Sequence, residues 1–156
     1  MESTFVPDPQ LHQVASQAAE KCVAFLKQKF GKNPDFSDRF VTEVEDVMNL
    51  LHLDLPASKP PEEVVQDMAT IFGSYLGETY RRNHGGEWGI ANGSPALRAR
   101  AGIECYPWMR AWKRLKNGYE DNVLHWYQYL LEHGGTPSVP PPLPSTPPPL
   151  PPQQGM

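Results

Sequence analysis

Apolar side chains recur at three- and four-residue steps in two segments of the first third of the chain, residues 11–26 and residues 40–51. The first segment follows Asp8 and Pro9 and is followed by Gly31. Asp is a good helix N-cap, Pro is tolerated at the first helical position, and Gly commonly ends a helix. Both segments therefore predict amphipathic helices.

The second helix is expected to begin at a cap formed by Ser37 or Asp38. Its acidic residues fall outside the apolar stripe and are expected to face water: Glu43, Glu45 and Asp46. Residues 53–63, "LDLPASKPPEE", contain three prolines and predict a connector. Within it, Ser58 followed by prolines signals the start of a third helix.

The third helix carries apolar residues on one side from position 64 to position 76 and is expected to stop at Gly85-Gly86. Gly73 and Gly77 lie four residues apart on the opposite side. Because Gly costs about 1 kcal/mol relative to Ala in a helix interior, two such residues require a reason. The close approach of another backbone is the expected reason, which predicts a central helix contacted on both sides.

After the double glycine the apolar pattern changes to a period of two. Residues 87–91 and 96–105 flank Asn92-Gly93, a favourable turn for a β-hairpin. Helical periodicity returns over residues 107–115 and, after an Asp121 or Asn122 cap, over residues 123–131. The sequence therefore predicts a mainly helical α+β fold with three helices, a β-hairpin and two helices. We assign residues 1–133 to one globular domain.

Residues 134–156 form a tail with ten prolines and no charged side chain, which predicts polyproline II or disorder. "PPPLP" occurs twice in it, and a protein with a proline-reading domain is one candidate partner. A passive spacer is the alternative. The candidate docking residues are Pro141, Pro142, Leu143, Pro144, Pro148, Pro149, Leu150 and Pro151. No basic residue flanks the prolines, so weak docking is expected.

Charge is spread unevenly over a chain whose formal net charge is −4. Residues 35–67 carry nine acids and two bases, whereas residues 79–118 carry eight bases and two acids. A basic segment can mark a nucleic-acid surface, here over residues 98–116. The alternatives are that the two segments pack together so that their fields partly cancel, or that the bases form a solvated face. The acidic pI favours these alternatives, so nucleic acid is not the expected partner.

Aromatic residues interleave with some of these bases: Trp108, Trp112, Trp126, Tyr127 and Tyr129. Such a mixture is found where proteins stack on single-stranded nucleic acid. Core tryptophans beside a wet basic flank are the favoured interpretation, because Trp108, Trp112 and Leu115 share one helical face.

Several kinds of chemistry lack their motifs in this chain. A glycine-rich phosphate loop, a dinucleotide fingerprint and a serine-nucleophile elbow are all missing, and the five histidines share no metal-ligand spacing. We expect no cofactor and no metal. Cys22 and Cys105 are far apart in apolar patterns, which favours buried free thiols and a cytoplasmic location. The sequence shows neither a signal peptide nor an apolar run of about 18 residues, so no membrane partner is expected.

The segment "SYLGETYRRNHGGEWGI" contains the candidate binding site: Glu78, Arg81, Arg82 and Trp88. Glu78 and Arg82 are spaced i,i+4 at the end of the third helix, which suits a buried polar joint covered by Trp88. A ligand or partner site made of the same residues is the alternative. A lone glutamate without a second catalytic group argues against hydrolysis, and no catalytic residue is assigned.

Residues 64–131 resemble a group of small uncharacterised bacterial proteins. The resemblance rests on "YLGETYRRNHGGEW", on "YPWMRAWKRLKNG" and on the aromatic helix "DNVLHWYQYLL". It singles out Gly77, Glu78, Arg81, Arg82, Gly85, Gly86, Trp88, Lys113, Arg114, Leu115 and Gly118. Some small bacterial proteins of this general type act as cytoplasmic partners or immunity proteins of toxins. The resemblance suggests such a role by analogy alone.

These observations favour a non-enzymatic protein of a bacterial cytoplasm that works by binding another protein. In an immunity-type version, the acidic residues of 35–67 would cover a basic site on a toxin. An adaptor with a docking tail is a second version. The alternatives are a ligand-sensing or enzymatic domain using Glu78, Arg81 and Arg82 beside Trp88, and nucleic-acid binding through residues 98–116.

Overall fold

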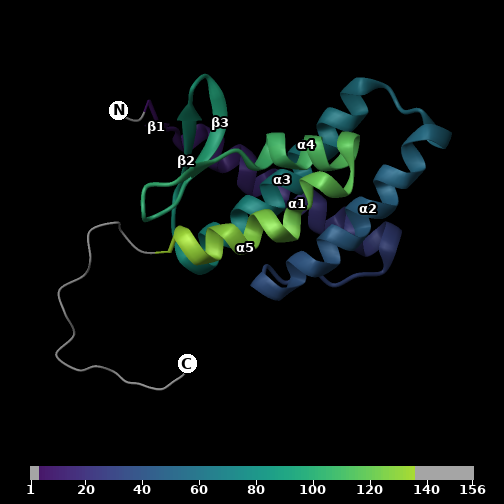
Figure 1. Cartoon of the computed structure of the whole chain (residues 1–156), viewed down its shortest axis with the longest axis horizontal. Helices are drawn as coiled ribbons and strands as arrows, with labels where there is room; N and C mark the ends of the chain where they lie inside the picture. The colour runs from purple at the N-terminus through teal and green to yellow at the C-terminus, as the bar shows by residue number, and fades with distance from the viewer. Residues whose placement is uncertain (1–3, 136–156) are drawn as a thin grey trace, which may run out of the picture.

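The computed structural model describes residues 4–135 (Figure 1). They form the mainly helical α+β fold that the sequence predicts, with five α-helices, two short 3-10 helices and a four-stranded antiparallel sheet. The elements are β1 (Val6–Pro7), α1 (Pro9–Phe30), η1 (Asp38–Phe40), α2 (Val41–Ser58), α3 (Glu62–His84), β2 (Glu87–Ala91), β3 (Ser94–Arg98), β4 (Glu104–Cys105), α4 (Pro107–Asn117), η2 (Tyr119–Asp121) and α5 (Val123–His133). The predicted docking residues of the tail lie outside the described residues.

Helix α3 is the centre of the molecule. It lies between α1 and α4, and its C-terminal end leads into the sheet (Figure 1). Every residue from Phe72 to Tyr80 is buried, so this part of α3 is covered on all sides. A helix enclosed in this way needs small residues where its neighbours come closest.

Gly73 and Gly77 supply those two positions. A Cβ atom at Gly73 would lie 2.6 Å from the carbonyl oxygen of Pro107 and 2.7 Å from the Cα atom of Trp108. The predicted close approach of a second backbone, that of α4, is thus confirmed at Gly73. At Gly77 the neighbour is a side chain instead, because a Cβ atom there would collide with the Trp88 ring.

The ends of α1 and α3 follow their sequence signals. The Asp8 side chain accepts hydrogen bonds from the backbone N–H groups of Gln10 and Leu11, and Pro9 is the first residue of α1. Gly31 ends α1 with a φ of 64°, and Gly85 ends α3 with a φ of 88°. Both angles lie in the region that glycine adopts at little cost.

Helix α2 is longer than predicted. The connector expected over residues 53–63 is wrong for its first half, because α2 continues through Pro56 to Ser58 and ends at Lys59 with a φ of 46°. Ser58 is not the cap of the third helix, which begins after Pro61 without a side-chain cap. Pro56 lies near the end of α2, where only the bond from its missing N–H to His52 is lost.

The hairpin is confirmed, with β2 and β3 joined at Asn92-Gly93 by a turn in which both residues have positive φ. The second predicted strand, residues 96–105, is wrong in its extent, since a turn at residues 100–102 separates β3 from β4. Strand β1 was not predicted and pairs with β2 at the other edge of the sheet. Within residues 4–135, no helix is long and apolar enough to cross a membrane.

We predict that Gly73→Ala destabilises the protein by about 1–3 kcal/mol, because the added methyl group would push α4 away from α3. In an open helix the same change would stabilise by roughly 1 kcal/mol, so the sign of the effect tests the packing. The measurement is the free energy of unfolding in urea. Asp67→Ala on the exposed side of α3 is the matched control, expected within about 0.5 kcal/mol of the wild type.

Candidate functional site

The structure brings together all four residues of the site predicted in the helix-turn segment. The fully buried Glu78 carboxylate accepts four hydrogen bonds: from Arg81 Nε at 2.7 Å, from Arg81 Nη2 at 3.0 Å, from Arg82 Nε at 2.9 Å and from Trp88 Nε1 at 2.7 Å. This is the geometry of the predicted polar joint. It links the last two turns of α3 to the first residues of β2.

The hydrogen-bond donors around Glu78 determine its charge state. Burial by itself raises the pKa of the carboxyl, but the hydrogen bonds from Arg81, Trp88 and Arg82 outweigh it and lower the pKa to about 2. The same contact with Glu78 raises the pKa of Arg81. Glu78 is therefore ionised at neutral pH and has no proton to donate.

This arrangement leaves Glu78 without a free acceptor position for general-base catalysis. A carboxylate has about four acceptor positions, and protein donors use four. A general base needs a free lone pair within reach of its substrate. The guanidinium groups of Arg81 and Arg82 are partly exposed, and Arg82 also lies over the Phe36 ring at 3.9 Å. The Arg82 guanidinium is thus held between Glu78 and the Phe36 ring, which is typical of a structural joint.

We predict that Glu78→Gln lowers the free energy of unfolding at pH 7 by about 2–4 kcal/mol, because two arginines and an indole lose their anionic acceptor. The folded pKa of about 2 lies below the unfolded value. The stabilisation is therefore present above about pH 4.3 and is lost as pH falls toward 2. Urea unfolding at pH 7 and near pH 2.5 checks this.

The matched control for that experiment is Glu20→Gln. Glu20 also faces Arg82, at 3.9 Å, but its side chain is 62% exposed. We expect a change within about 0.5 kcal/mol and an unaltered pH dependence. Equal effects of both substitutions would contradict the assignment of Glu78 as the joint.

A second buried ion pair was not predicted. Glu45, expected to face water, is buried in α2 and accepts hydrogen bonds from Arg114 Nε at 3.0 Å and Arg114 Nη2 at 2.7 Å. Its other oxygen accepts the backbone N–H of Val123 at 3.0 Å, and Asn49 accepts from Arg114 Nη2 at 2.8 Å. The pair joins α2, α4 and the start of α5, where an unpaired charge would cost about 3–5 kcal/mol.

Most bases of the basic segment form ion pairs within the molecule. Six of its eight bases form ion pairs: Arg81 and Arg82 with Glu78, Arg98 with Glu87, Arg110 with Asp121, Arg114 with Glu45 and Lys116 with Glu62. The last two pairs reach into the acidic segment, so the expectation that the two segments pack together is confirmed. Within residues 4–135, Arg100 and Lys113 form no ion pair.

Potential metal ligands do not gather in the described part of the chain, and its two cysteines are buried. Residues 4–135 contain no group of three or more His, Cys, Asp or Glu side chains placed to hold a metal ion. Cys22 and Cys105 are free and buried, as the sequence suggests. Burial raises the pKa of the Cys105 thiol to about 12, so it is not a thiolate at neutral pH.

The aromatic residues of α4 and α5 are the feature whose position the sequence did not reveal. Trp108, Trp112 and Trp126 are only partly buried, whereas Tyr127 belongs to the core and Tyr129 is 53% exposed. The interpretation as core tryptophans is thus only partly right. The clustering of tryptophans in the sequence signals a special surface, but only the fold shows on which side of α4 they lie.

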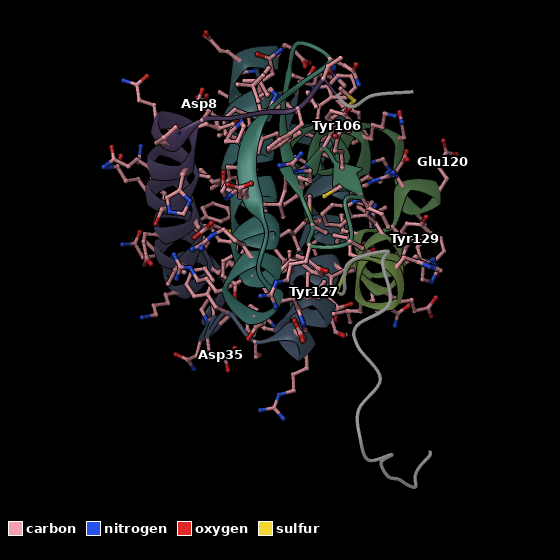
Figure 2. The ribbon with its side chains drawn as sticks, turned by 90° about the vertical axis from the view of Figure 1, so that its left-hand side faces the viewer. Asp8, Asp35, Tyr106, Glu120, Tyr127 and Tyr129 are labelled. Carbon is pink, nitrogen blue, oxygen red and sulfur yellow. The ribbon has the colours of Figure 1, made fainter. Side chains whose placement is uncertain are left out.

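Two hollows flank the exposed Met109 side chain of α4. One, of about 490 Å³, lies between α4, α5 and β4; we call it the α4–α5 hollow. Its lining includes Tyr106, Met109, Arg110, Lys113, Trp126 and Tyr129. In Figure 2, Tyr106, Glu120 and Tyr129 mark this side of the molecule, away from Asp8 at the start of α1. Aromatic rings, two cations and the carboxylates of Glu104 and Glu120 thus line one concave surface.

The second hollow, of about 550 Å³, lies between α4, α3 and β3 and is lined mainly by apolar atoms. Trp108, Trp112 and Pro95 line it, together with Met109 and Lys113, which the two hollows share. The indole N–H groups of Trp108 and Trp112 donate to Ser74 and Glu62, each at 2.8 Å, which fixes both rings. The result is one pre-formed aromatic surface, centred on Met109, which we call the Met109 surface.

Comparisons with known proteins show a likeness of fold alone. A scan of protein-family models and a search of curated proteins gave no match. Among solved structures, a protein from Bacteroides thetaiotaomicron VPI-5482 is similar, with a TM-score of 0.61 and 18% sequence identity. The similarity covers 85% of this chain and 48% of that chain, so this chain spans about half the length of its neighbour.

Proposed function

We propose that this chain is a non-enzymatic protein-binding protein that holds its partner on the Met109 surface. The observation that carries the proposal is the gathering of three partly exposed tryptophans, Met109 and Tyr129 around two adjoining hollows. Trp, Tyr, Met and Arg are the residues enriched at the centres of protein interfaces. An adaptor of a bacterial cytoplasm fits this reading.

The energetics favour an interface at this surface. Met109 is 45% exposed and Tyr129 is 53% exposed, so both retain apolar area that a partner would remove from water. The indoles of Trp108 and Trp112 are already held by hydrogen bonds, so binding would cost them little side-chain entropy. Rigid aromatic groups in concave surroundings are the usual anchors of tight contacts.

The immunity-type version of the proposal concerns the acidic segment. Five of its nine acids make internal contacts: Asp35, Asp38, Glu43, Glu45 and Glu62. Asp46 and Asp54 remain exposed on α2 beside Leu50 and Leu53, whose side chains are 55% and 64% exposed. This acidic and apolar helix face offers a second contact suited to a basic partner.

The rival functions have weaker support in the geometry. A ligand-sensing or enzymatic site at Glu78, Arg81, Arg82 and Trp88 would have to displace protein donors from a buried carboxylate. Nucleic-acid binding through residues 98–116 would rely on bases of which Arg98, Arg110, Arg114 and Lys116 already face carboxylates. Both therefore rank below protein binding.

We predict that a photo-crosslinking amino acid at position 109, introduced in the producing organism, captures a specific protein, because this position lies between the two hollows. The same group at Gln13, exposed on α1, is the matched control and should capture no such protein. The same photo-crosslinking amino acid at Leu53 tests the acidic and apolar face of α2. Mass spectrometry of the adducts identifies the partner.

Once the partner is identified, its binding should be weakened at least about 10-fold by Met109→Asp, because this substitution places a charge at the centre of the interface. Titration calorimetry with the purified partner checks this value. Capture of the same proteins from positions 109 and 13 would contradict a specific Met109 surface.

We predict no useful affinity for nucleic acid. At about 0.15 M salt, mixed-sequence DNA or RNA should not bind at micromolar concentration, because phosphate contacts require free cations. Fluorescence anisotropy with a labelled oligonucleotide checks this. Micromolar binding with a steep salt dependence, lost in Arg100→Ala/Lys113→Ala, would contradict the prediction.

A further inference from the structure

The α4–α5 hollow presents hydrogen-bond donors whose acceptors are not in the described part of the chain. Within residues 4–135, Trp126 is the one tryptophan whose indole N–H donates no hydrogen bond; those of Trp88, Trp108 and Trp112 all donate. The Lys113 ammonium has no ion-pair partner there, and Arg110 uses only its Nη1 atom, toward Asp121 at 2.9 Å. The hollow also contains the acceptors of Glu104, Glu120 and Asn122, but the Trp126 and Lys113 donors remain available for a ligand that brings carbonyl oxygens.

Such a ligand is present in the sequence of this chain. Residues 139–152, "VPPPLPSTPPPLPP", contain nine prolines, each of which lacks a backbone N–H but keeps its carbonyl oxygen. Proline and leucine side chains also pack well on aromatic rings, the mode by which proline-rich segments bind aromatic-lined grooves. Here Tyr106, Trp126 and Tyr129 supply the rings. The segment therefore offers carbonyl acceptors for the Trp126 and Lys113 donors and apolar side chains for the rings.

The end of the described chain lies close to the hollow. The Gly134 carbonyl oxygen accepts a hydrogen bond from the Ala101 backbone N–H at 3.1 Å. This fixes the end of α5 beside the turn that leads into Ile103 and β4, both of which line the hollow. Tyr129 and Trp126 precede the end of α5 by about 6 Å and 10 Å along the helix axis.

The length of the intervening chain is sufficient. Residues 136–139 separate Gly135 from Pro140 and span at most about 14 Å when extended. This reach exceeds the distance back along α5 to Trp126. A segment tethered so closely has an effective concentration in the millimolar range, so even weak contacts would be occupied.

We infer that residues 139–152 dock in the α4–α5 hollow of their own molecule and cover part of the Met109 surface. The Trp126 indole N–H and the Lys113 ammonium donate to proline carbonyl oxygens, while Pro and Leu side chains pack on Trp126 and Tyr129. The inference rests on the proposed function in treating this surface as a binding surface. It adds that a partner has to displace the tail.

The test compares the full chain with a variant of equal length in which the nine prolines of residues 139–152 are replaced by serine. The four tryptophan indole N–H signals are recorded by ¹⁵N–¹H NMR and assigned with Trp126→Phe. We expect the Trp126 signal to shift between the two proteins. The Trp88 signal should stay in place, because its indole is buried on Glu78. Added peptide of residues 139–152 should move the Trp126 signal of the variant back toward its wild-type position.

Tyr129→Ala supplies a second readout, because this exposed side chain can be removed without harming the core. In a Tyr129→Ala background, replacing the prolines should shift the Trp126 signal much less. An unchanged Trp126 signal in the wild-type background would overturn the inference. So would a shift that depends on protein concentration together with a dimer in light scattering, since the tail would then bind a second copy.

These outcomes are independent of the photo-crosslinking at position 109. A partner captured there, with no effect of the prolines on Trp126, would leave the proposed function standing without the docked tail. A proline-dependent Trp126 signal without any captured partner would leave the docked tail standing without the proposed function.

Discussion

The contact between α3 and α4 at Gly73 sets the geometry of the whole molecule. With no side chain at this position, the backbone of α4 lies against that of α3, and Pro107 and Trp108 occupy the space that a Cβ atom would take. That contact places the rest of α4 and its aromatic residues at the surface. Were the two helices even a little farther apart, the hollows on either side of Met109 would change shape with them.

The buried ion pairs follow from the same enclosure. Because α3 is covered on all sides, Glu78 is carried into the interior and has to find its donors there. Glu45 is enclosed between α2, α4 and α5 in the same way and is compensated by Arg114. Ion pairs within the molecule thus neutralise many of the charges that are unevenly spread along the sequence. On α4 and α5 the side chains left for an interface are largely aromatic, which supports the proposal of protein binding over nucleic acid.

The helices and the hairpin could be predicted from the sequence because their signals are local. The Asp8 cap, the Gly31 stop and the Asn92-Gly93 turn act through residues only a few positions apart. Even the joint at Glu78 is local, since Arg81 and Arg82 lie within one turn of it. The double glycine and the nearby tryptophan in the sequence already indicated that Glu78 would be buried.

The features that escaped prediction depend on contacts distant in sequence. Glu45 looked solvent-facing because its partner, Arg114, is 69 residues away, and the helical pattern contains no sign of that partner. Strand β1 has two residues and exists because it pairs with Ile90 and Gly89 of β2. The hollow around Trp126 is likewise a product of three elements meeting, so no single stretch of sequence encodes its shape.

The long reach of the Glu45 contacts has a consequence for synthesis. Its partners, Arg114 and the backbone of Val123, are made 69 and 78 residues later. A nascent chain that ends before α4 contains α1, α2 and α3, but it leaves this carboxylate without its cation and Gly73 without the backbone of α4 against it. The contacts of Glu45 can therefore form only after α4 and the start of α5 have been made, so this part of the core is completed late in translation rather than helix by helix.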